Sequence, residues 1–498
     1  MSSIIVDTFY GIVSKTPLQP AIKLSQLMGN DIYLKREDLQ QVHSFKIRGA
    51  YNKIAQLTSE ELSRGVITAS AGNHAQGVAL SAQKLGSTAI IVMPVTTPDI
   101  KVEAVRKYGG DVVLYGDSFS DAYEHCQQIA ERTGRVFVHP FDDPLVIAGQ
   151  GTIGSEILEQ LPDVDYIFVP VGGGGLAAGV AELVKQANTD IKIIGVEPDE
   201  SNAMQQSLKA NERLALSYVS TFADGVAVKQ VGEHTFQAVR KFVDEVITVS
   251  TDELCAAMKY IYEDTRSIVE PSGALSIAGS IKHLAEQNIT GKTIATVSSG
   301  ANIPFEKLRF VAERTVAGSG KEVLLAIELP EKPGALLSLC EDVINGHAIT
   351  EFNYRLNDRS KAHIFVGIMV PDNQDKIALY ESLDQHKYSY TDLSDDEIAK
   401  VHVRRMIGGP SPKAKNEHLY EVIFPERPGA LRDFLKTVGT ECNISLFNYR
   451  GIGGDNGRVC IGFETVKVKR LETMIGQSHY EFHHLHSEAA DLFLGVMK

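Results

Sequence analysis

The 498-residue sequence has no tryptophan, and its five cysteines include no C-x-x-C pair. An odd number of scattered cysteines does not suggest a disulfide framework or a zinc site, and it favours a reducing compartment. No apolar run approaches the ~20 residues that a membrane-spanning helix needs. The N-terminal segment MSSIIVDTFYGIV lacks a basic flank and a small-residue cleavage site, which makes it a poor signal peptide. These absences favour a cytoplasmic protein that does not enter the membrane.

The chain also has fewer basic than acidic residues. The chain has 49 Lys and Arg residues against 63 Asp and Glu residues, a formal net charge of −14. No basic face is therefore expected to meet the phosphate backbone of a nucleic acid. A composition of 43% hydrophobic and 22% charged residues is typical of globular proteins, and the length predicts about three compact units.

Short β-branched runs alternate with amphipathic helical stretches between residues 66 and 299. The expected strands are residues 66–70, 89–93, 166–171, 192–198, 246–250 and 293–299. Ser250 and Glu253 form a capping box that opens the helix after the fifth of these strands. Apolar strands that alternate with helices predict a parallel sheet covered on both faces. We therefore expect an α/β domain in two lobes over residues 1–318.

The sequence repeats itself after a break at residues 317–322. Residues 328–355 match residues 423–450, and equivalent positions such as Asn353 and Asn448 lie 95 residues apart. Such a constant spacing indicates two copies of one small unit. Each copy reads as strand, Pro-Gly turn, helix, strand and strand, which is a ferredoxin-like order.

We assign the two copies to residues 322–395 and 417–498, with a helix expected at residues 395–407 and a linker at residues 408–413. Together with the α/β domain they account for the three compact units that the length predicts. The alternative is a decayed duplication without a role.

The segment HSFKIRG (residues 43–49) contains the first candidate for chemistry, Lys46. An isolated lysine is usually a solvated surface charge. Here Phe45 and Ile47 flank the lysine beside a helix start, so the ammonium is expected to be partly desolvated. Desolvation lowers the pKa of a lysine and frees the amine to form a covalent bond with a carbonyl carbon.

The segment SAGNHAQG (residues 70–77) lies between an expected strand and an expected helix. Small residues let backbone N–H groups approach a ligand, and a helix N-terminus favours an anion such as a substrate carboxylate. The alternative is an ordinary Asn or Ser cap on the helix. His74 by itself is more typical of a structural histidine than of a catalytic one.

Four glycines (residues 172–175) separate an apolar strand from a helix. They predict a phosphate site, because they remove side-chain bulk in front of a helix dipole. Gly172, Gly174 and Ala177 also fit a dinucleotide fingerprint, with Glu197 in the place of its acidic residue. That pattern is weak alone and leaves the lysine unexplained.

The last expected strand ends in SSGAN (residues 298–302). Ser299 could hydrogen-bond the nitrogen of a ligand ring without protonating it. Equally, a Ser-Ser-Gly turn needs no ligand, so this motif decides nothing alone.

The four segments SFKIRGA, SAGNHAQG, GGGG and SSGAN occur together in the order and approximate spacing of the fold-type II pyridoxal-phosphate enzymes, which this chain resembles. The repeated tails with ERPGAL and FNYR resemble the ACT-like domains of the biosynthetic threonine deaminase family. The resemblance covers nearly the whole chain. It implies a two-lobed catalytic domain similar to tryptophan synthase β, followed by two α+β, ferredoxin-like regulatory domains.

The resemblance also implies a role for each motif. Lys46 would bind pyridoxal 5′-phosphate covalently and remove the α-proton of the substrate. The other implied cofactor contacts are Phe45 against the ring, Asn73 on the ring 3-oxygen, Gly172, Gly173, Gly174 and Gly175 around the phosphate, and Ser299 at the pyridine nitrogen. The substrate carboxylate would lie among Ser70, Ala71, Gly72 and Asn73.

A neutral serine at position 299 has a physical consequence. It leaves the ring unprotonated and therefore a weaker electron sink, which favours elimination over transamination. The related serine racemases and dehydratases bind a metal through a glutamate and an aspartate six residues later, but here Glu197 is followed by Ala203. We therefore expect no metal. Glu270 and Asp224 match family segments near the cofactor without a definite role.

The implied reaction is the dehydration and deamination of L-threonine to 2-oxobutanoate and ammonia, the first step of isoleucine biosynthesis, in a homotetramer. Isoleucine would inhibit and valine would oppose it. The expected effector contacts are Phe352, Asn353, Tyr354 and Arg355 in the first copy and Phe447, Asn448, Tyr449 and Arg450 in the second.

Four alternatives stay open at this point. They are a serine dehydratase, a threonine synthase, a nicotinamide-dependent oxidoreductase, and an amino-acid-binding regulator without activity. Ile47 speaks against a threonine synthase, because that group usually has an acidic residue after the lysine.

Overall fold

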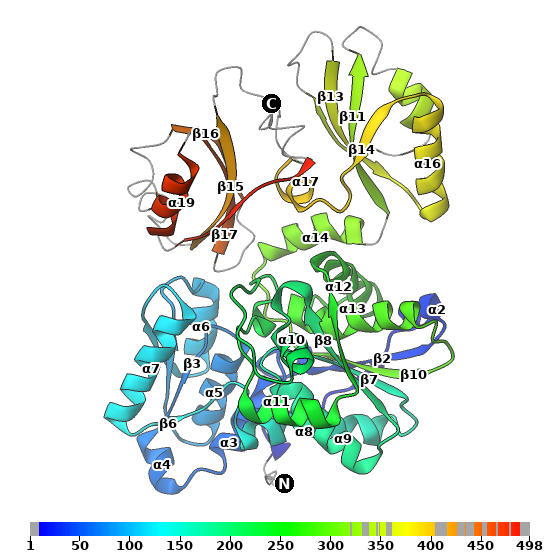
Figure 1. Ribbon diagram of the computed structural model, residues 1–498. Coiled ribbons are helices and arrows are strands. Elements are labelled where there is room, and N and C mark those ends of the chain that lie inside the picture. Colours follow the sequence, from blue (N-terminus) through cyan, green and yellow to red (C-terminus); the bar gives the residue numbers. More distant parts are fainter. Residues whose placement is uncertain are drawn as a thin grey trace. The chain divides into compact units, whose positions relative to one another are not determined.

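A computed structural model describes residues 9–318, 321–330, 338–344, 347, 349–354, 361–403, 416–425, 434, 443–450, 456–464, 467–477 and 480–488. The chain divides into two compact units, Met1–Lys307 and Leu308–Lys498, and Figure 1 shows the elements of each. Within the described ranges, no helix is long and apolar enough to cross a membrane.

The first unit contains two sheets, as expected of two lobes. The larger has the order β1-β2-β10-β7-β8-β9 and the smaller the order β5-β4-β3-β6. All neighbouring strands are parallel except β1 and β2, which are antiparallel. The strands are β1 (Leu18–Pro20), β2 (Asp31–Arg36), β3 (Val66–Ala69), β4 (Ala89–Met93), β5 (Gly110–Leu114), β6 (Val136–Phe137), β7 (Tyr166–Pro170), β8 (Lys192–Pro198), β9 (Glu245–Val249) and β10 (Thr293–Ser298).

Helices cover both faces of these sheets, which confirms the predicted architecture. In the larger lobe α12 and α13 lie on one side of the sheet, and α8, α9 and α11 lie on the other (Figure 1). Ser250 caps α12 in the expected capping box. The helices are α2 (Ile22–Met28), α3 (Lys46–Ile54), α4 (Ser59–Arg64), α5 (Asn73–Lys84), α6 (Asp99–Lys107), α7 (Phe119–Thr133), α8 (Pro144–Gln160), α9 (Gly175–Ala187), α10 (Ala203–Ala210), α11 (Glu233–Phe242), α12 (Thr251–Thr265) and α13 (Pro271–Glu286), with the 3-10 turns η1 (Glu37–Leu39), η2 (Asp199–Ser201) and η3 (Asp224–Val226).

The smaller lobe shows why its strands read as continuous apolar runs. Successive side chains of a strand point to opposite faces, and both faces are buried here. Val66 of β3 joins a core cluster with α5 and α6, while the next residue, Ile67, joins a cluster with α7. Most positions of β3 and β4 are therefore apolar, as in other parallel sheets covered on both sides, and the buried Thr68 hydroxyl donates to the carbonyl of Val138.

Three helices meet with almost no side chain between them, and they join the motif segments. A Cβ at Gly149 of α8 would lie 2.7 Å from the Cα of Gly49 in α3. A Cβ at Gly179 of α9 would lie 2.7 Å from the backbone nitrogen of Gly151 in α8. Since α3 begins at Lys46 and α9 begins at Gly175, this glycine seam fixes the lysine segment relative to the glycine run.

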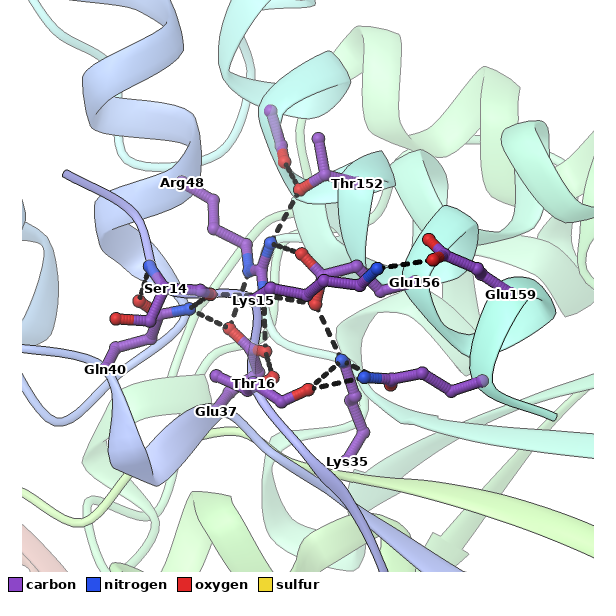
Figure 2. A network of polar contacts seen from close by, with 12 residues as sticks. Ser14, Lys15, Thr16, Lys35, Glu37, Gln40, Arg48, Thr152, Glu156 and Glu159 are labelled. Atoms are coloured by element: carbon purple, nitrogen blue, oxygen red, sulfur yellow. Dashed lines mark hydrogen bonds and ion pairs between the residues drawn. The ribbon is translucent and has the colours of Figure 1, made fainter. Parts of the chain in front are cut away.

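A buried ion network lies beside the same seam (Figure 2). Arg48, two residues after Lys46, forms a two-point contact with Glu37 at 2.7 and 2.8 Å and another with Glu156 at 2.6 and 2.9 Å. Lys35 donates to Glu156 at 2.6 Å. The four side chains are at most 1% exposed. Two cations thus face two anions within one buried cluster.

Further partners of the network come from the segment before β1. Thr16 donates through its hydroxyl to Glu37, and its carbonyl accepts from Lys35. Burial by itself raises the pKa of Glu37, but Arg48, Thr16 and Lys35 together outweigh burial, so the pKa of Glu37 is lowered. Buried charges need such complete pairing to be tolerated. The network therefore joins the N-terminal segment, β2, α3 and α8 behind the motif residues.

The second unit contains two antiparallel sheets of equivalent order, β12-β13-β11-β14 and β16-β17-β15-β18. The bulge between Ile349 and Glu351 in β12 has its equivalent between Ile444 and Leu446 in β16, 95 positions later. The predicted repeat is confirmed. The strands are β11 (Glu322–Pro330), β12 (Ile349–Tyr354), β13 (Lys361–Met369), β14 (Ser389–Asp392), β15 (Glu417–Pro425), β16 (Asn443–Arg450), β17 (Asn456–Glu464) and β18 (Glu481–His484).

The helices of this unit differ in part from the expectation. Each copy has a further helix and a fourth strand, which the sequence reading did not include. The helix expected at residues 395–407 is short, with α17 at Glu397–Val401. The described helices are α14 (Lys307–Gly318), η4 (Cys340–Ile344), α16 (Asn373–Gln385), α17 (Glu397–Val401) and α19 (Val468–Gln477). Arg355, both Pro-Gly turns and the linker 408–413 lie outside the described residues.

Candidate active site

Lys46 is the first residue of α3, as the helix-start pattern predicted. Its Nζ donates to the carbonyl oxygen of Pro140 at 3.0 Å and lies 5.3 Å from the centre of the Phe45 ring. Burial lowers the pKa of Lys46 to about 8, although the negative charge of Glu270 opposes this shift. A substantial fraction of the amine is therefore neutral near pH 7 to 8, as covalent chemistry requires.

The segment from Ser70 to Asn73 links β3 to α5 and leaves space for a ligand. A Cβ at Gly72 would have no atom within 4 Å. No side chain caps α5, so the ordinary Asn or Ser cap is not what the structure contains. An uncapped helix N-terminus beside open space suits a small carboxylate.

His74 is bonded to the backbone. Its Nε2 lies 2.9 Å from the carbonyl oxygen of Val138. Burial, with a smaller effect of Lys46, lowers the pKa of His74 to about 3. A neutral imidazole bonded to the backbone agrees with the structural reading of this residue.

Asn73 is held by a polar cluster that sequence reasoning missed in part. Its Nδ2 donates to Glu270 Oε1 at 2.7 Å, and its Oδ1 accepts from Asn302 at 2.7 Å. Ser272 donates to the same oxygen of Glu270 at 2.7 Å. An amide nitrogen carries two hydrogens, so Asn73 keeps one for a ligand. Asn302 lies inside the SSGAN motif, which was the available signal for it.

Glu270 has an unusual electrostatic environment. Burial and the nearby charge of Asp224 raise the pKa of Glu270 to about 7. Its carboxyl group is therefore close to half-ionised at neutral pH, and the strength with which it orients Asn73 depends on pH. The sequence had identified Glu270 without a role.

The glycine run forms the loop between β7 and α9. Within residues 9–318, no hydrogen bond engages the backbone N–H groups of Gly172 to Gly175, and Gly173 to Gly175 are buried. Buried N–H groups normally have an acceptor, and the start of a helix favours an anionic one such as phosphate. Four unbonded donors thus fit the phosphate site that the sequence predicted.

The reason for glycine here is partly different from the expected one. A Cβ at Gly173 would lie 2.3 Å from the Phe141 ring, so a side chain of the protein itself fills that space. Gly174 has φ +95°, a conformation that other residues rarely adopt. The missing side chains accommodate Phe141 and the turn, while the N–H groups stay free for a ligand.

Ser299 follows β10 and lies beside the lysine segment. Its carbonyl accepts from the backbone nitrogen of Phe45 at 3.1 Å, and its hydroxyl donates to the carbonyl of Ser272 at 3.1 Å. Pro140 and Phe141 are adjacent, and they touch Lys46 and Gly173 respectively. The structure therefore brings all four motifs to one place.

Glu197 does not serve this site. Both of its oxygens accept backbone N–H groups at the start of α10, from Met204 at 2.9 Å and Gln205 at 2.8 Å. A carboxylate committed in this way is not available for a nucleotide ribose. Among the described residues, no group of three or more His, Cys, Asp and Glu side chains could hold a metal ion.

Comparisons with known proteins agree with this geometry. The family of pyridoxal-phosphate dependent enzymes matches residues 10–300, and the C-terminal regulatory domain of threonine dehydratase matches residues 313–403 and 408–494. The biosynthetic L-threonine dehydratase of Burkholderia multivorans is 48% identical over 95% of this chain and 94% of its own length. That of Escherichia coli is 48% identical over 95% and 92%.

Solved structures match the catalytic part. A processed threonine deaminase isoform 2 from Solanum lycopersicum has a TM-score of 0.61 and 51% identity, over 61% of this chain and 89% of that one. A maize serine racemase has a TM-score of 0.58 and 35% identity, over 63% and 95%. The predicted fold class and cofactor are confirmed, and the dinucleotide alternative is wrong.

Proposed function

This chain belongs to the threonine dehydratase family of pyridoxal-phosphate-dependent lyases, and on that premise we propose that it converts L-threonine into 2-oxobutanoate and ammonia. The observation that carries the proposal is the regulatory region after residue 313, joined to a catalytic unit that contains Lys46. The catalytic unit by itself is also similar to a serine racemase, so serine is the second candidate substrate.

Several features of the first unit fit pyridoxal phosphate. The four N–H groups of Gly172 to Gly175 would bind the phosphate, and Lys46 would bind the aldehyde carbon. Asn73 has one amide hydrogen left for the ring 3-oxygen, and Phe45 lies beside the amine. When bound, this cofactor withdraws electrons from the α-carbon of an amino acid.

Residues of the protein would bind the substrate, orient it and accept its α-proton. The uncapped start of α5, with Ser70, Ala71, Gly72 and Asn73, would bind the substrate carboxylate and orient the α-carbon towards Lys46. The Lys46 amine, once released from the cofactor, would accept the α-proton, because a pKa near the working pH suits a general base.

Ser299→Asp should slow threonine deamination by about tenfold or more, which corresponds to ~1.4 kcal/mol in the barrier, and should raise the share of transamination. The Ser299 hydroxyl now donates to the Ser272 carbonyl. A carboxylate there would face that carbonyl and would hold a proton between itself and the ring nitrogen. Product ratios from threonine test this. Ser299→Ala is the control, and wild-type rate and product ratio in Ser299→Asp would place the serine away from the ring.

We further infer that the second unit binds isoleucine as an inhibitor and valine as its opponent. Phe352 to Tyr354 lie on the edge strand β12, and Phe447 to Arg450 lie on the edge strand β16 of the equivalent sheet. The proposed contacts are Phe352 to Arg355 and Phe447 to Arg450. The domain limits 1–318, 322–395 and 417–498, the cytoplasmic location and the homotetramer belong to the same proposal.

Isoleucine should shift the apparent affinity of the full-length protein for threonine by about 5- to 150-fold, the usual range of allosteric coupling. Valine should reverse the shift. The measurement is the release of 2-oxobutanoate across threonine concentrations at fixed isoleucine, with serine as the comparison substrate. If millimolar isoleucine leaves the apparent affinity for threonine unchanged, the repeats are a scaffold and not a sensor.

A further inference from the structure

Asp224 is held by lysines from two distant parts of the chain. Lys101 of α6 donates to its carboxylate at 2.5 Å, and Lys307 lies 3.6 Å from the other oxygen. Lys307 also donates to the carbonyl oxygen of Phe222 at 3.0 Å. Thus one lysine holds both the turn η3 and the loop that leads into it.

This cluster is not a surface ion pair. The side chain of Lys307 is 1% exposed and that of Lys101 is 11% exposed, while that of Asp224 between them is 27% exposed. Burial alone raises the pKa of Asp224, but the two lysines outweigh burial and hold the pKa well below its usual range. Screening by water is weak in such a place, so a change in either lysine is felt by neighbouring charges.

A neighbouring charge belongs to the site already described. A Cβ at Gly225 would lie 2.5 Å from the Ser272 hydroxyl and 3.4 Å from Glu270 Oε1, so the turn η3 packs directly on the Glu270 cluster. Asp224 raises and Lys101 lowers the pKa of Glu270. Glu270 in turn accepts the hydrogen bond from Asn73.

Lys307 is also the first residue of α14, which runs on to Gly318. The regulatory family match begins within this helix, at residue 313. Because Lys307 belongs to α14, a movement of this helix also moves Lys307, and no further contact is needed to transmit it.

We propose that Lys307 is a positioning residue for the segment that binds the substrate carboxylate, acting through Asp224 and Glu270 on Asn73, and that effector binding reaches the active site through it. The inference deepens the proposed function and rests on it. If the Lys307 ammonium group moves away from Asp224, the negative charge of Asp224 is less neutralised. Glu270 then holds its proton more strongly, and a protonated carboxyl is a weaker acceptor for Asn73.

The charged groups that face Glu270 set the sign of the pH effect. They are Asp224 in η3, Lys101 in α6 and Lys46 in α3. The ionised form of Glu270 orients Asn73, so threonine binding weakens as the pH falls through the pKa of Glu270. Loss of the Lys307 charge raises that pKa, and the weakening then begins at a higher pH.

Lys307→Gln in the full-length holoenzyme should raise KM for threonine about fivefold or more, with kcat within about twofold of wild type. The pH at which KM rises should move upward. Isoleucine should still bind by calorimetry but should change KM less than in wild type. Lys307→Arg, which keeps the charge, should restore all three properties. Lys292→Gln, at the opposite end of β10 and paired with Asp165, should leave them unchanged.

Lys101→Gln tests the effect on the pH dependence separately from the isoleucine response. It also replaces Lys307→Gln as the test variant if that protein does not fold. It should move the pH dependence in the same direction but keep the isoleucine effect, because Lys101 is not in α14. Wild-type KM, pH dependence and isoleucine response in Lys307→Gln would overturn the inference. If wild-type protein releases no 2-oxobutanoate, the proposed function fails. The pH titration of the lysine-bound cofactor absorbance, expected to shift in Lys307→Gln, then decides the inference separately.

Discussion

Lys46→Ala is expected to abolish 2-oxobutanoate release, with a fall in kcat of at least about 10⁴-fold, because covalent attachment and proton transfer are lost together. The long-wavelength absorbance of the lysine-bound cofactor should disappear as well. Among the residues that the structure describes, the amine makes one hydrogen bond, to the Pro140 carbonyl, and such a bond contributes about 1 kcal/mol. The variant should therefore fold and keep its circular dichroism spectrum.

Lys53→Ala is the matched control for this experiment. Lys53 lies in the same helix, α3, and forms an ion pair with Asp143 at 2.8 Å. Its ion pair is to Asp143 and not to a residue of the four motifs, so its loss should leave the cofactor absorbance intact and kcat within a few-fold. A Lys46→Ala variant that retained even a few per cent of the activity would show that another residue is the base.

Glu156→Gln should lower the free energy of unfolding of the first unit by about 3 to 5 kcal/mol, the usual cost of breaking a buried ion pair from one side. The carboxylate neutralises both Arg48 and Lys35. Its replacement leaves two buried cations opposite Glu37 alone. The change should also lower the affinity for the cofactor, since Arg48 lies in the first turn of the Lys46 helix. Urea unfolding followed by circular dichroism measures the first effect, and cofactor titration measures the second.

The control lies one turn away on the same helix. Glu159 pairs with Lys15, and both side chains are exposed, at 67% and 41%. Exposed pairs contribute at most about 1 kcal/mol, so Glu159→Gln should unfold close to wild type. Equal urea midpoints for Glu156→Gln and Glu159→Gln would mean that the buried network does not stabilise the protein.

The sequence predicted those features that depend on neighbours along the chain. β4 and β8 have the predicted limits, Ala89–Met93 and Lys192–Pro198, because apolar β-branched runs between turn residues allow little else. The repeat followed from a constant spacing. Lys46 and the glycine run were found because each motif is local.

Features that depend on contacts between distant segments were missed. Lys307 and Lys101 are 206 positions apart in the sequence, and nothing local distinguishes them from surface lysines. The same holds for Glu37 and Glu156, because charged residues are usually exposed. The phosphate reading of the glycines, which stays a prediction, did not include the Phe141 ring that packs against Gly173 and Gly175.

The glycine seam between α3, α8 and α9 limits the routes by which this enzyme can evolve. Every replacement of glycine adds at least a Cβ, and at Gly149 or Gly179 that atom would overlap backbone of the facing helix. The backbone cannot move aside as the end of a flexible side chain can, so we expect that even a substitution by alanine is not tolerated at these positions. The spacing between the lysine and the glycine run is therefore expected to be inherited unchanged, while positions away from the seam remain open to change.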